Sequence, residues 1–221
     1  GYQYGAPLST TGSYPLWVST ETSNMGTATA PANLSNSSLK WETSEQTDFG
    51  LDIRAFQDRL SFTMDYYIKK TKDLLTLGTP PLIAGNAATT VNAGNVENRG
   101  FEFDLSYRNS VGAFNYNISA NLSTLHNEVT YMNPNQPYLT GATVNLETAT
   151  RFDVGHPIWY FYGYKTNGID PETGNPLYIS RDGETVKTVS SEDKTYIGSG
   201  IPTLMYGMNI DLSYKGFDFK A

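Results

Sequence analysis

The sequence predicts an all-β fold, a segment of a large antiparallel transmembrane β-barrel with long extracellular loops. Three observations predict it: windows of alternating apolar and polar residues, an alternation of short and long connections, and an aromatic-rich composition with few charges. The 221 residues include 13% aromatic and 17% charged residues and no cysteine. Cysteine-based catalysis and cysteine metal sites are therefore excluded. The net charge of −7 argues against nucleic acid as a partner.

Five windows predict β-strands, because their apolar and polar residues alternate one by one and successive side chains of a strand point to opposite faces. The windows are 48–55, 59–68, 101–108, 114–123 and 204–214. On this pattern we expect Leu60, Phe62, Phe103, Ile118 and Ile210 to face lipid, and Asp48, Asp52, Asp104, Asn117 and Asp211 to face a water-filled lumen.

The same alternation would also suit a soluble antiparallel sheet with one wet face. Two features favour the barrel. The windows run to about 10 residues or more, enough to cross a bilayer when tilted, whereas strands of soluble proteins average about 5–6 residues. The polar faces are also dense in Asp, Asn and Ser, as expected of residues that line an aqueous lumen.

The connections between these windows alternate in length. The turns near 57–58, 109–112 and 215–216 are short, whereas 75–95 and 125–201 are long and rich in Gly, Pro, Thr and Asn. Outer-membrane barrels have short periplasmic turns and long extracellular loops, so the alternation fixes the direction of each strand. The strand in window 114–123 ends on the extracellular side, where the long connection 125–201 begins. The strand that begins near residue 203 therefore also starts on the extracellular side.

The alternation of short and long connections divides the chain into four parts, which are given at the end of this paragraph. The long excursion includes Ile158–Tyr164, which is aromatic on both faces, so we expect β-structure above the membrane there rather than a lipid-facing strand. The chain ends a few residues into a further strand, and an open edge in lipid would leave backbone groups unpaired, so we expect a segment of a larger barrel. The parts are an extracellular loop (1–44), four transmembrane strands (45–126), a long extracellular excursion (127–201), and a transmembrane strand with the start of the next (202–221).

Ordered sequence motifs cover nearly the whole chain. They are LKWETSEQTDFGLD at 39–52, DYYIKKTKDLL at 65–75, NAGNVENRGFE at 92–102, GHPIWYFYGYK at 155–165, and YIGSGIP at 196–202 followed by YKGFD at 214–218. Together these motifs resemble the SusC/RagA family of TonB-dependent transporters. Their number and their order make the resemblance specific.

The resemblance implies a full barrel of about 22 strands with an N-terminal plug domain. The plug is expected to be absent from this chain. The resemblance also implies a multi-pass β-barrel surrounded by lipid in the outer membrane of a Gram-negative bacterium, importing oligosaccharides or oligopeptides. The implied partners are a SusD-like surface lipoprotein, which closes over the barrel as a lid, and TonB, which would act through parts not in this chain.

The aromatic run Trp159, Tyr160, Phe161 and Tyr162 is the sharpest candidate for substrate or lid binding. Aromatic faces can stack on sugar rings or anchor a protein partner. The alternative is that these rings pack the excursion against its neighbours.

No catalytic residue, metal site or cofactor is predicted. His126 and His156 have no Ser, Cys or carboxylate partner at a spacing that suggests catalysis. Asp170 and Glu172 lie where family members often carry an acidic, Gly-rich stretch, and could suggest a cation site. The simpler interpretation is a turn, since Asp-Pro and Thr-Gly are turn sequences and calcium needs six or more oxygen ligands.

Three functions compete at this point. TonB-dependent import is the leading hypothesis, and the chain is not expected to be an enzyme. A soluble or surface-exposed carbohydrate-binding β module is the alternative, and it would dissolve without detergent. An outer-membrane enzyme barrel is a third hypothesis with less support, because no pair of nucleophile and base stands out.

Overall fold

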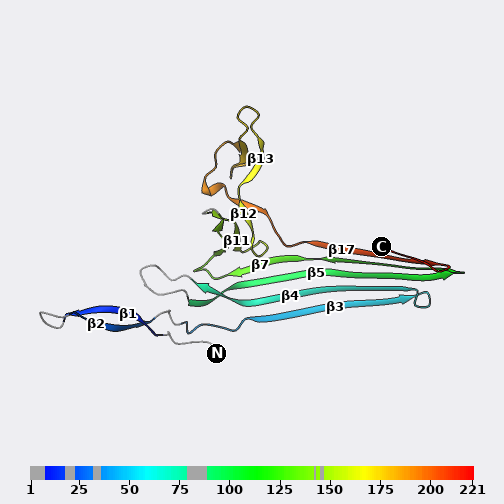
Figure 1. The fold of residues 1–221 in the computed structure, drawn as a ribbon, viewed down its shortest axis with the longest axis horizontal. Coiled ribbons are helices and arrows are strands. Elements are labelled where there is room, and N and C mark those ends of the chain that lie inside the picture. The colour runs from blue at the N-terminus through cyan, green and yellow to red at the C-terminus, as the bar shows by residue number, and fades with distance from the viewer. Residues whose placement is uncertain (1–7, 18–22, 32–35, 79–88, 142, 145–146) are drawn as a thin grey trace. The chain divides into compact units, whose positions relative to one another are not determined.

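The computed structural model describes residues 8–17, 23–31, 36–78, 89–141, 143–144 and 147–221 (Figure 1). They form β-strands and one short 3-10 helix, η2 (Ser191–Asp193). No helix in this described part is long and apolar enough to cross a membrane. The chain divides into two compact units, Gly1–Thr43 with Lys72–Gly94, and Ser44–Thr71 with Asn95–Ala221.

Long strands form the main sheet, in the hydrogen-bonded order β18-β17-β6-β5-β4-β3. A shorter strand, β7 (His126–Met132), pairs with β5 beside this path. The strands adjoining β6 and β17 are antiparallel. The bounds are β3 (Thr43–Ala55), β4 (Leu60–Gly78), β5 (Thr89–Val111), β6 (Phe114–Thr124), β17 (Leu204–Tyr214) and β18 (Phe217–Lys220). Each of the five predicted strands is present, so the sequence-based fold class is confirmed.

The register gives this sheet one apolar and one polar face, because residues directly opposite each other on neighbouring strands point to the same side. One apolar row across three strands consists of Tyr107, Ile118 and Ile210. The adjacent polar row, on the other face, consists of Arg108, Asn117 and Asp211. The pattern in the sequence therefore predicted the two faces, while their orientation toward lipid and lumen remains a prediction.

Side-chain contacts strengthen each face. On the polar face, Asn117 Nδ2 donates to Asp211 Oδ2 at 3.2 Å, and Thr63 Oγ1 donates to Asp52 Oδ1 at 2.7 Å. On the apolar face, the rings of Phe62 and Phe103 lie 6.4 Å apart between centroids. Such cross-strand pairs are the units that stabilise a sheet and fix its register.

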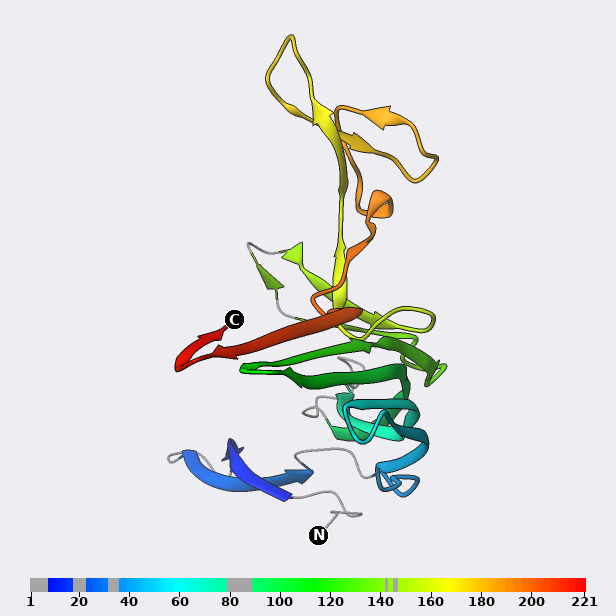
Figure 2. The same cartoon turned by 90° about the vertical axis from the view of Figure 1, so that its right-hand side faces the viewer.

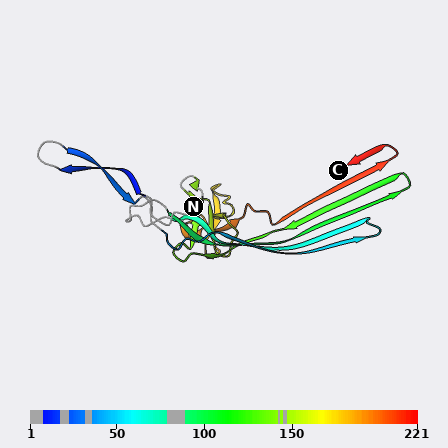
Figure 3. The same ribbon diagram turned by 90° about the horizontal axis from the view of Figure 1, so that it is seen from below.

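The short turns of the main sheet lie at one end of the long strands (Figure 3). Lys215 and Gly216 form the turn between β17 and β18 with φ of 46° and 88°, the positive values that a tight two-residue hairpin requires. The turn predicted at 109–112 is shorter in the structure. Strand pairing continues to Val111 and Phe114, and Asn109 Nδ2 donates to Tyr116 Oη at 3.2 Å, so these polar residues extend the ladder.

Gly100 permits a close approach between β5 and the end of β6. A Cβ atom built at this position would lie 1.9 Å from the carbonyl oxygen of Thr124. Beside it, Phe101 N donates to Thr124 Oγ1 at 2.9 Å. The glycine of the NRGFE sequence is thus required by backbone proximity.

The described residues of the excursion between β6 and β17 include three small sheets. Leu125 N donates to Thr203 O at 3.0 Å, so the excursion begins and ends at the same end of the long strands (Figure 2). The sheets are β16-β12-β11-β8, β13-β14-β15 and β10-β9. Their strands are β8 (Tyr138–Thr140), β9 (Thr143–Val144), β10 (Glu147–Thr148), β11 (Thr150–Asp153), β12 (Tyr160–Gly163), β13 (Lys165–Ile169), β14 (Pro176–Ile179), β15 (Thr185–Val186) and β16 (Thr195–Gly198).

The first unit contains a hairpin that the sequence analysis did not predict. Strands β1 (Leu8–Trp17) and β2 (Ser23–Pro31) pair antiparallel, within the part predicted as an extracellular loop. Elsewhere in this unit, Asn92 acts as a clamp: its Nδ2 donates to Lys40 O at 3.0 Å and to Asp73 O at 2.8 Å, and its Oδ1 accepts from Lys40 N at 2.9 Å.

Candidate functional site

The aromatic run 159–162 is positioned by a buried asparagine at the base of the excursion. Asn127 on β7 is 7% exposed. Its Nδ2 donates to Asn98 Oδ1 on β5 at 2.7 Å, and its Oδ1 accepts from Ile158 N at 2.7 Å. One side chain thus ties the segment leading into β12 to a strand of the main sheet, and both of its polar ends are satisfied.

Backbone contacts and a small core complete this base. Val129 N donates to His156 O and Gly155 N donates to Val129 O, both at 2.9 Å. Around these bonds the buried apolar side chains Val129, Met132, Phe152 and Tyr160 form the core of the excursion. Burial of such side chains is what orders the segment, since each removes apolar surface from water.

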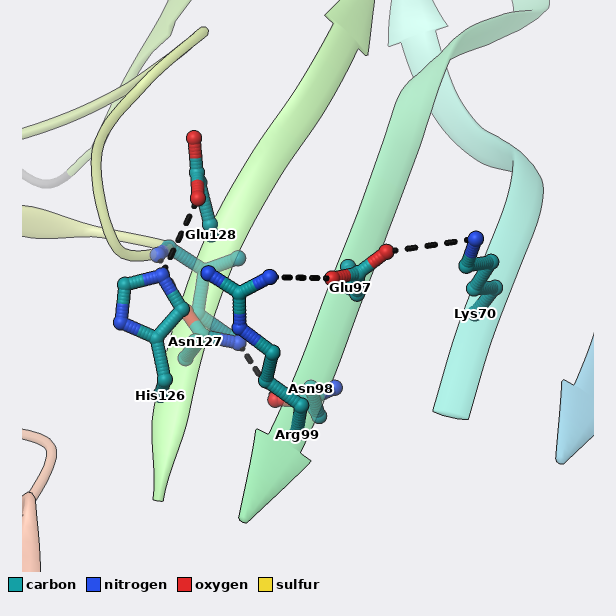
Figure 4. Close-up of polar contacts among 8 residues, drawn as sticks. Lys70, Glu97, Asn98, Arg99, His126, Asn127 and Glu128 are labelled. Atoms are coloured by element: carbon teal, nitrogen blue, oxygen red, sulfur yellow. Dashed lines mark hydrogen bonds and ion pairs between the residues drawn. The ribbon is translucent and has the colours of Figure 1, made fainter. Parts of the chain in front are cut away.

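Ion pairs beside Asn127 are exposed. Glu97 contacts Arg99 at 3.3 Å and Lys70 at 3.4 Å, and both cationic side chains are about half exposed (Figure 4). His126 Nε2 lies 3.0 Å from Glu128 Oε2, also with substantial exposure. Exposed pairs of this kind contribute little to stability. They mark a solvated surface beside the base rather than a reactive centre.

The four residues of the aromatic run divide between two faces. Tyr160 lies opposite Arg151 in the β11–β12 register, and Tyr160 and Tyr162 both line a cavity of about 760 Å³. Trp159, which has a φ of 51°, lies 5.5 Å from the Phe152 ring, and Phe161 is 44% exposed. The structure therefore brings two of the four predicted residues into the cavity.

The carboxylate of Asp153, which lines the cavity, is contacted by three other side chains of the lining. Tyr160 Oη donates to Asp153 Oδ2 at 3.2 Å. Arg151 Nε lies 2.9 Å from the same oxygen, and His156 Nδ1 lies 2.9 Å from Oδ1. Both contacts are short, but they lack the alignment of hydrogen bonds. Burial, and then the charge of Asp153, raise the pKa of Tyr160 above its usual value, so the phenol stays protonated and can donate.

Aromatic rings restrain the Arg151 and His156 side chains of this wall. The Arg151 guanidinium carbon lies 4.1 Å from the Tyr138 ring centroid and 4.9 Å from that of Tyr162. The His156 ring stacks on Tyr160 at 4.6 Å and on Tyr196 at 5.8 Å. The guanidinium is attracted to the ring faces by their quadrupole, so its contacts restrain orientation as well as position. The His156 ring is restrained by stacking.

Further cationic residues line the same cavity, including Lys165, Arg181 and Lys194. Lys194 is paired with Glu147, whose hydrogen bond raises the pKa of Lys194. Asp193 accepts hydrogen bonds from Ser190 N and Arg181 N, which lower the pKa of Asp193 and keep it charged. The cavity therefore presents fixed charges of both signs.

Asp170 forms a turn, as the simpler interpretation of its sequence predicted. Its side chain accepts from Lys187 Nζ at 2.7 Å, Thr173 Oγ1 at 2.9 Å and Glu172 N at 3.0 Å. These donors occupy the oxygens that a cation would need. In the described part of the chain, no cluster of three or more His, Cys, Asp or Glu residues could hold a metal ion.

Sequence analysis missed several residues of this site, namely Tyr138, Arg151, Asp153 and Tyr196. It also indicated no carboxylate partner for the histidines, whereas the structure places Glu128 beside His126 and Asp153 beside His156. One usable signal was present. Arg151 and Asp153 are two residues apart on a strand, which puts them on one face.

Comparison with known proteins identifies the family. The family model described as "TonB dependent receptor-like, beta-barrel" matches residues 1–214. The chain belongs to this family.

Named relatives agree with the assignment. TonB-dependent receptor P3 of Formosa agariphila is 32% identical over 207 residues, covering 85% of this chain and 20% of the relative. TonB-dependent receptor SusC of Bacteroides thetaiotaomicron is 29% identical over 197 residues, covering 84% of this chain and 19% of that protein. The chain thus spans about a fifth of the length of the relatives it matches.

Solved structures match over the whole chain. A structure of the RagAB peptide importer in its open-open state superimposes with a TM-score of 0.77 at 28% identity, covering 99% of this chain and 23% of the importer chain. The closed-closed state gives 0.74 at 28% identity. The SusC/RagA resemblance carried by the sequence motifs is therefore confirmed.

Proposed function

We propose that this chain is part of a TonB-dependent importer in the outer membrane of a Gram-negative bacterium. The observation that carries the proposal is the match to the RagAB peptide importer over 99% of this chain. The substrates proposed are oligosaccharides or oligopeptides, and the proposed partners are a SusD-like surface lipoprotein and TonB. No enzymatic activity is proposed, since the relatives are receptors and transporters.

Within this proposal the main sheet spans the membrane. Its apolar face, including Ile118 and Ile210, contacts lipid, and its polar face, including Asn117 and Asp211, lines the lumen. Strands β4 and β5 are 19 and 23 residues long, well beyond the strands of about 5–6 residues common in soluble proteins. This length supports the barrel over a soluble carbohydrate-binding module.

The excursion 127–201 is proposed to lie on the extracellular side and to contact substrate or the lipoprotein lid. Its aromatic residues support this, because aromatic anchors carry much of the binding energy in many interfaces. Tyr162, which lines the cavity, is a better candidate anchor than Trp159, whose ring packs at a tilt against Phe152.

Uptake by the full-length protein tests the import function. Cells carrying the intact protein and its neighbouring lipoprotein should accumulate a labelled oligosaccharide or oligopeptide, and deletion of TonB should abolish accumulation while leaving surface binding. Proteins that copurify would separate the substrates, with a glycosidase pointing to glycans and a protease to peptides. TonB-independent accumulation would contradict the proposal.

A substitution series tests the binding site. Tyr162→Ala should weaken binding by about 1–3 kcal/mol if this ring is an anchor. Trp159→Ala offers a comparison on the other face, and barrel assembly should be normal in both variants. Misassembly with unchanged affinity in the protein that folds would instead show that the rings only pack the excursion.

A further inference from the structure

The guanidinium of Arg151 is oriented before any ligand arrives. Asp153 lies 2.9 Å from its Nε, and the rings of Tyr138 and Tyr162 lie 4.1 and 4.9 Å from its central carbon. An arginine side chain normally has wide rotamer freedom, and binding a ligand would have to remove it. Here the protein's own contacts have already removed much of that freedom.

The outer edge of the same guanidinium remains available. Its Nε edge meets Asp153, so the Nη1 and Nη2 atoms form the edge left over, and Arg151 lines the cavity. Among the residues that the structure describes, these two atoms have no hydrogen-bond partner. The side chain is 25% exposed, which leaves it accessible but partly desolvated. A planar pair of N–H donors matches the two oxygens of a carboxylate.

The surroundings favour a negative charge at this edge. Lys165 and Arg181 line the cavity and, within the described part of the chain, have no anionic side-chain partner. Three carboxylates also line the cavity, but Asp153 contacts Arg151 and Asp193 accepts backbone and hydroxyl donors, which leaves Glu192 as the third. The four cationic side chains Arg151, Lys165, Arg181 and Lys194 therefore still outnumber the carboxylates of the lining. The cavity of about 760 Å³ also has room for a ligand group larger than a single ion.

We propose that this cavity binds a carboxylate-bearing part of the substrate, with Arg151 gripping the carboxylate through its Nη edge. Asp153 acts as the positioning residue that holds Arg151. Tyr162 and Tyr196 also line the cavity, so their rings can contact the ligand group that carries the carboxylate. The inference rests on the proposed import function, because it names the ligand chemistry of that importer's external site.

A carboxylate can come from two sources, a uronic acid in a glycan or an acidic side chain or terminus in a peptide. The test uses the full-length importer with its lipoprotein, purified in detergent, and isothermal titration calorimetry. The probes are trigalacturonate and its methyl ester, and a Glu-rich hexapeptide and its Gln counterpart. Each pair has the same skeleton and differs in charge.

The free acid of at least one pair should bind about tenfold or more tightly than its neutral partner, as expected for hydrogen bonds to a charged group. Preference within the sugar pair assigns a uronate, and preference within the peptide pair assigns an acidic peptide. Equal binding of acid and neutral probes in both pairs, or no binding of any probe, overturns the inference. This comparison needs no variant, so it holds even if substitution of Arg151 impairs folding.

Variants then locate the site. Arg151→Gln should remove the preference for the acid, and Arg151→Lys should restore only part of it, because an ammonium keeps the charge without the planar fork. Arg99→Gln, an exposed arginine outside the cavity, is the matched control and should keep the full preference. A full preference retained in Arg151→Gln contradicts the proposal. Binding in detergent does not depend on TonB, so failure here is distinguishable from failure of import.

Discussion

At the scale of single residues, position along a strand determines how a substitution acts. Ile210 and Asn209 are neighbours on β17, yet Ile210 lies opposite Ile118 and Asn209 lies opposite Ser119. They therefore project from opposite faces of the main sheet. The two positions share backbone geometry and strand depth, which makes them a matched pair.

Ile210→Arg should destabilise the full-length barrel by about 2–4 kcal/mol if its face meets the bilayer core, because a charge in lipid loses its hydration. Asn209→Arg should have a much smaller effect. Unfolding in urea from lipid vesicles measures both. Equal effects would refute the assignment of the two faces.

Gly100→Ala should destabilise the full-length protein by about 1–3 kcal/mol, since the new methyl would overlap the Thr124 carbonyl and neither backbone can move freely. The control is Gly50→Ala, where the nearest atom is the mobile carboxylate of Asp65. That variant should be close to the parent protein. Thermal unfolding followed by heat-dependent mobility on gels provides the comparison, and a larger effect at Gly50 would contradict this explanation.

The candidate site was only partly predictable at this scale. Aromatic character alone drew attention to Tyr160 and Tyr162, and also to Trp159 and Phe161, which do not line the cavity. Arg151 is a candidate binding residue because its guanidinium is oriented by the rings of Tyr138 and Tyr162, which lie on the two strands that flank β11. That arrangement depends on the order β16-β12-β11-β8, which no local pattern specifies.

At the scale of elements, the β13–β14 hairpin depends on one carboxylate. The side-chain contact from Lys187 is the largest cause that lowers the pKa of Asp170, followed by the backbone N–H of Glu172. A lowered folded pKa means that the stabilisation is fully present above the unfolded value, about 4, and is lost as the pH falls through the lower folded value.

Hydrogen exchange in the full-length protein should therefore show a protected hairpin at neutral pH and a more open one below about pH 4. Asp170→Asn should open the same segment already at neutral pH, because Lys187 and the turn N–H groups lose their charged acceptor. Asp182→Asn, an exposed carboxylate in the next turn, is the control. If Asp170→Asn exchanged like the control, the carboxylate would not be what holds the turn.

The long strands were predictable because the alternation that defines them is local and sustained. The ends of these strands were less predictable. Asn109 and Ser110 are residue types common in turns, but in the structure they pair with Tyr116 and Asn115 and continue the strands. The β1–β2 hairpin was missed because Leu8–Trp17 has no strict alternation and includes Gly12 and Pro15. Pairing between two strands supplied what the single-strand pattern did not show.

At the scale of the whole molecule, the main sheet has two edges, β3 and β18. Open edges carry unpaired N–H and C=O groups and invite association with other chains. Many large apolar side chains of the long strands are also exposed in this segment, among them Phe49, Leu105 and Met208. Both features are consistent with the proposal that this sheet is part of a barrel in lipid.

We therefore expect the isolated segment to aggregate, or to stay in solution only with denaturant, when it is expressed alone. Analytical ultracentrifugation in plain buffer and in detergent measures this. A monodisperse monomer that unfolds cooperatively without detergent would contradict the membrane assignment and would revive the soluble-module alternative.

The base of the excursion has a consequence for how such proteins diversify. Thr124 pairs with Leu204, and Leu125 bonds to Thr203, so β6 and β17 meet as though a tight turn joined them. Strand β7 keeps its pairing with β5, so the part of the excursion beyond β7 is the part that can change in length or sequence while the ladder keeps its register. The excursion is in effect an insertion between two strands whose pairing does not depend on it. Transplanting 126–202, with β7 included, between relatives should therefore transfer ligand preference while β3 to β6 and β17 of the recipient stay unchanged. The proposed importer could then change its substrate without a change in these long strands.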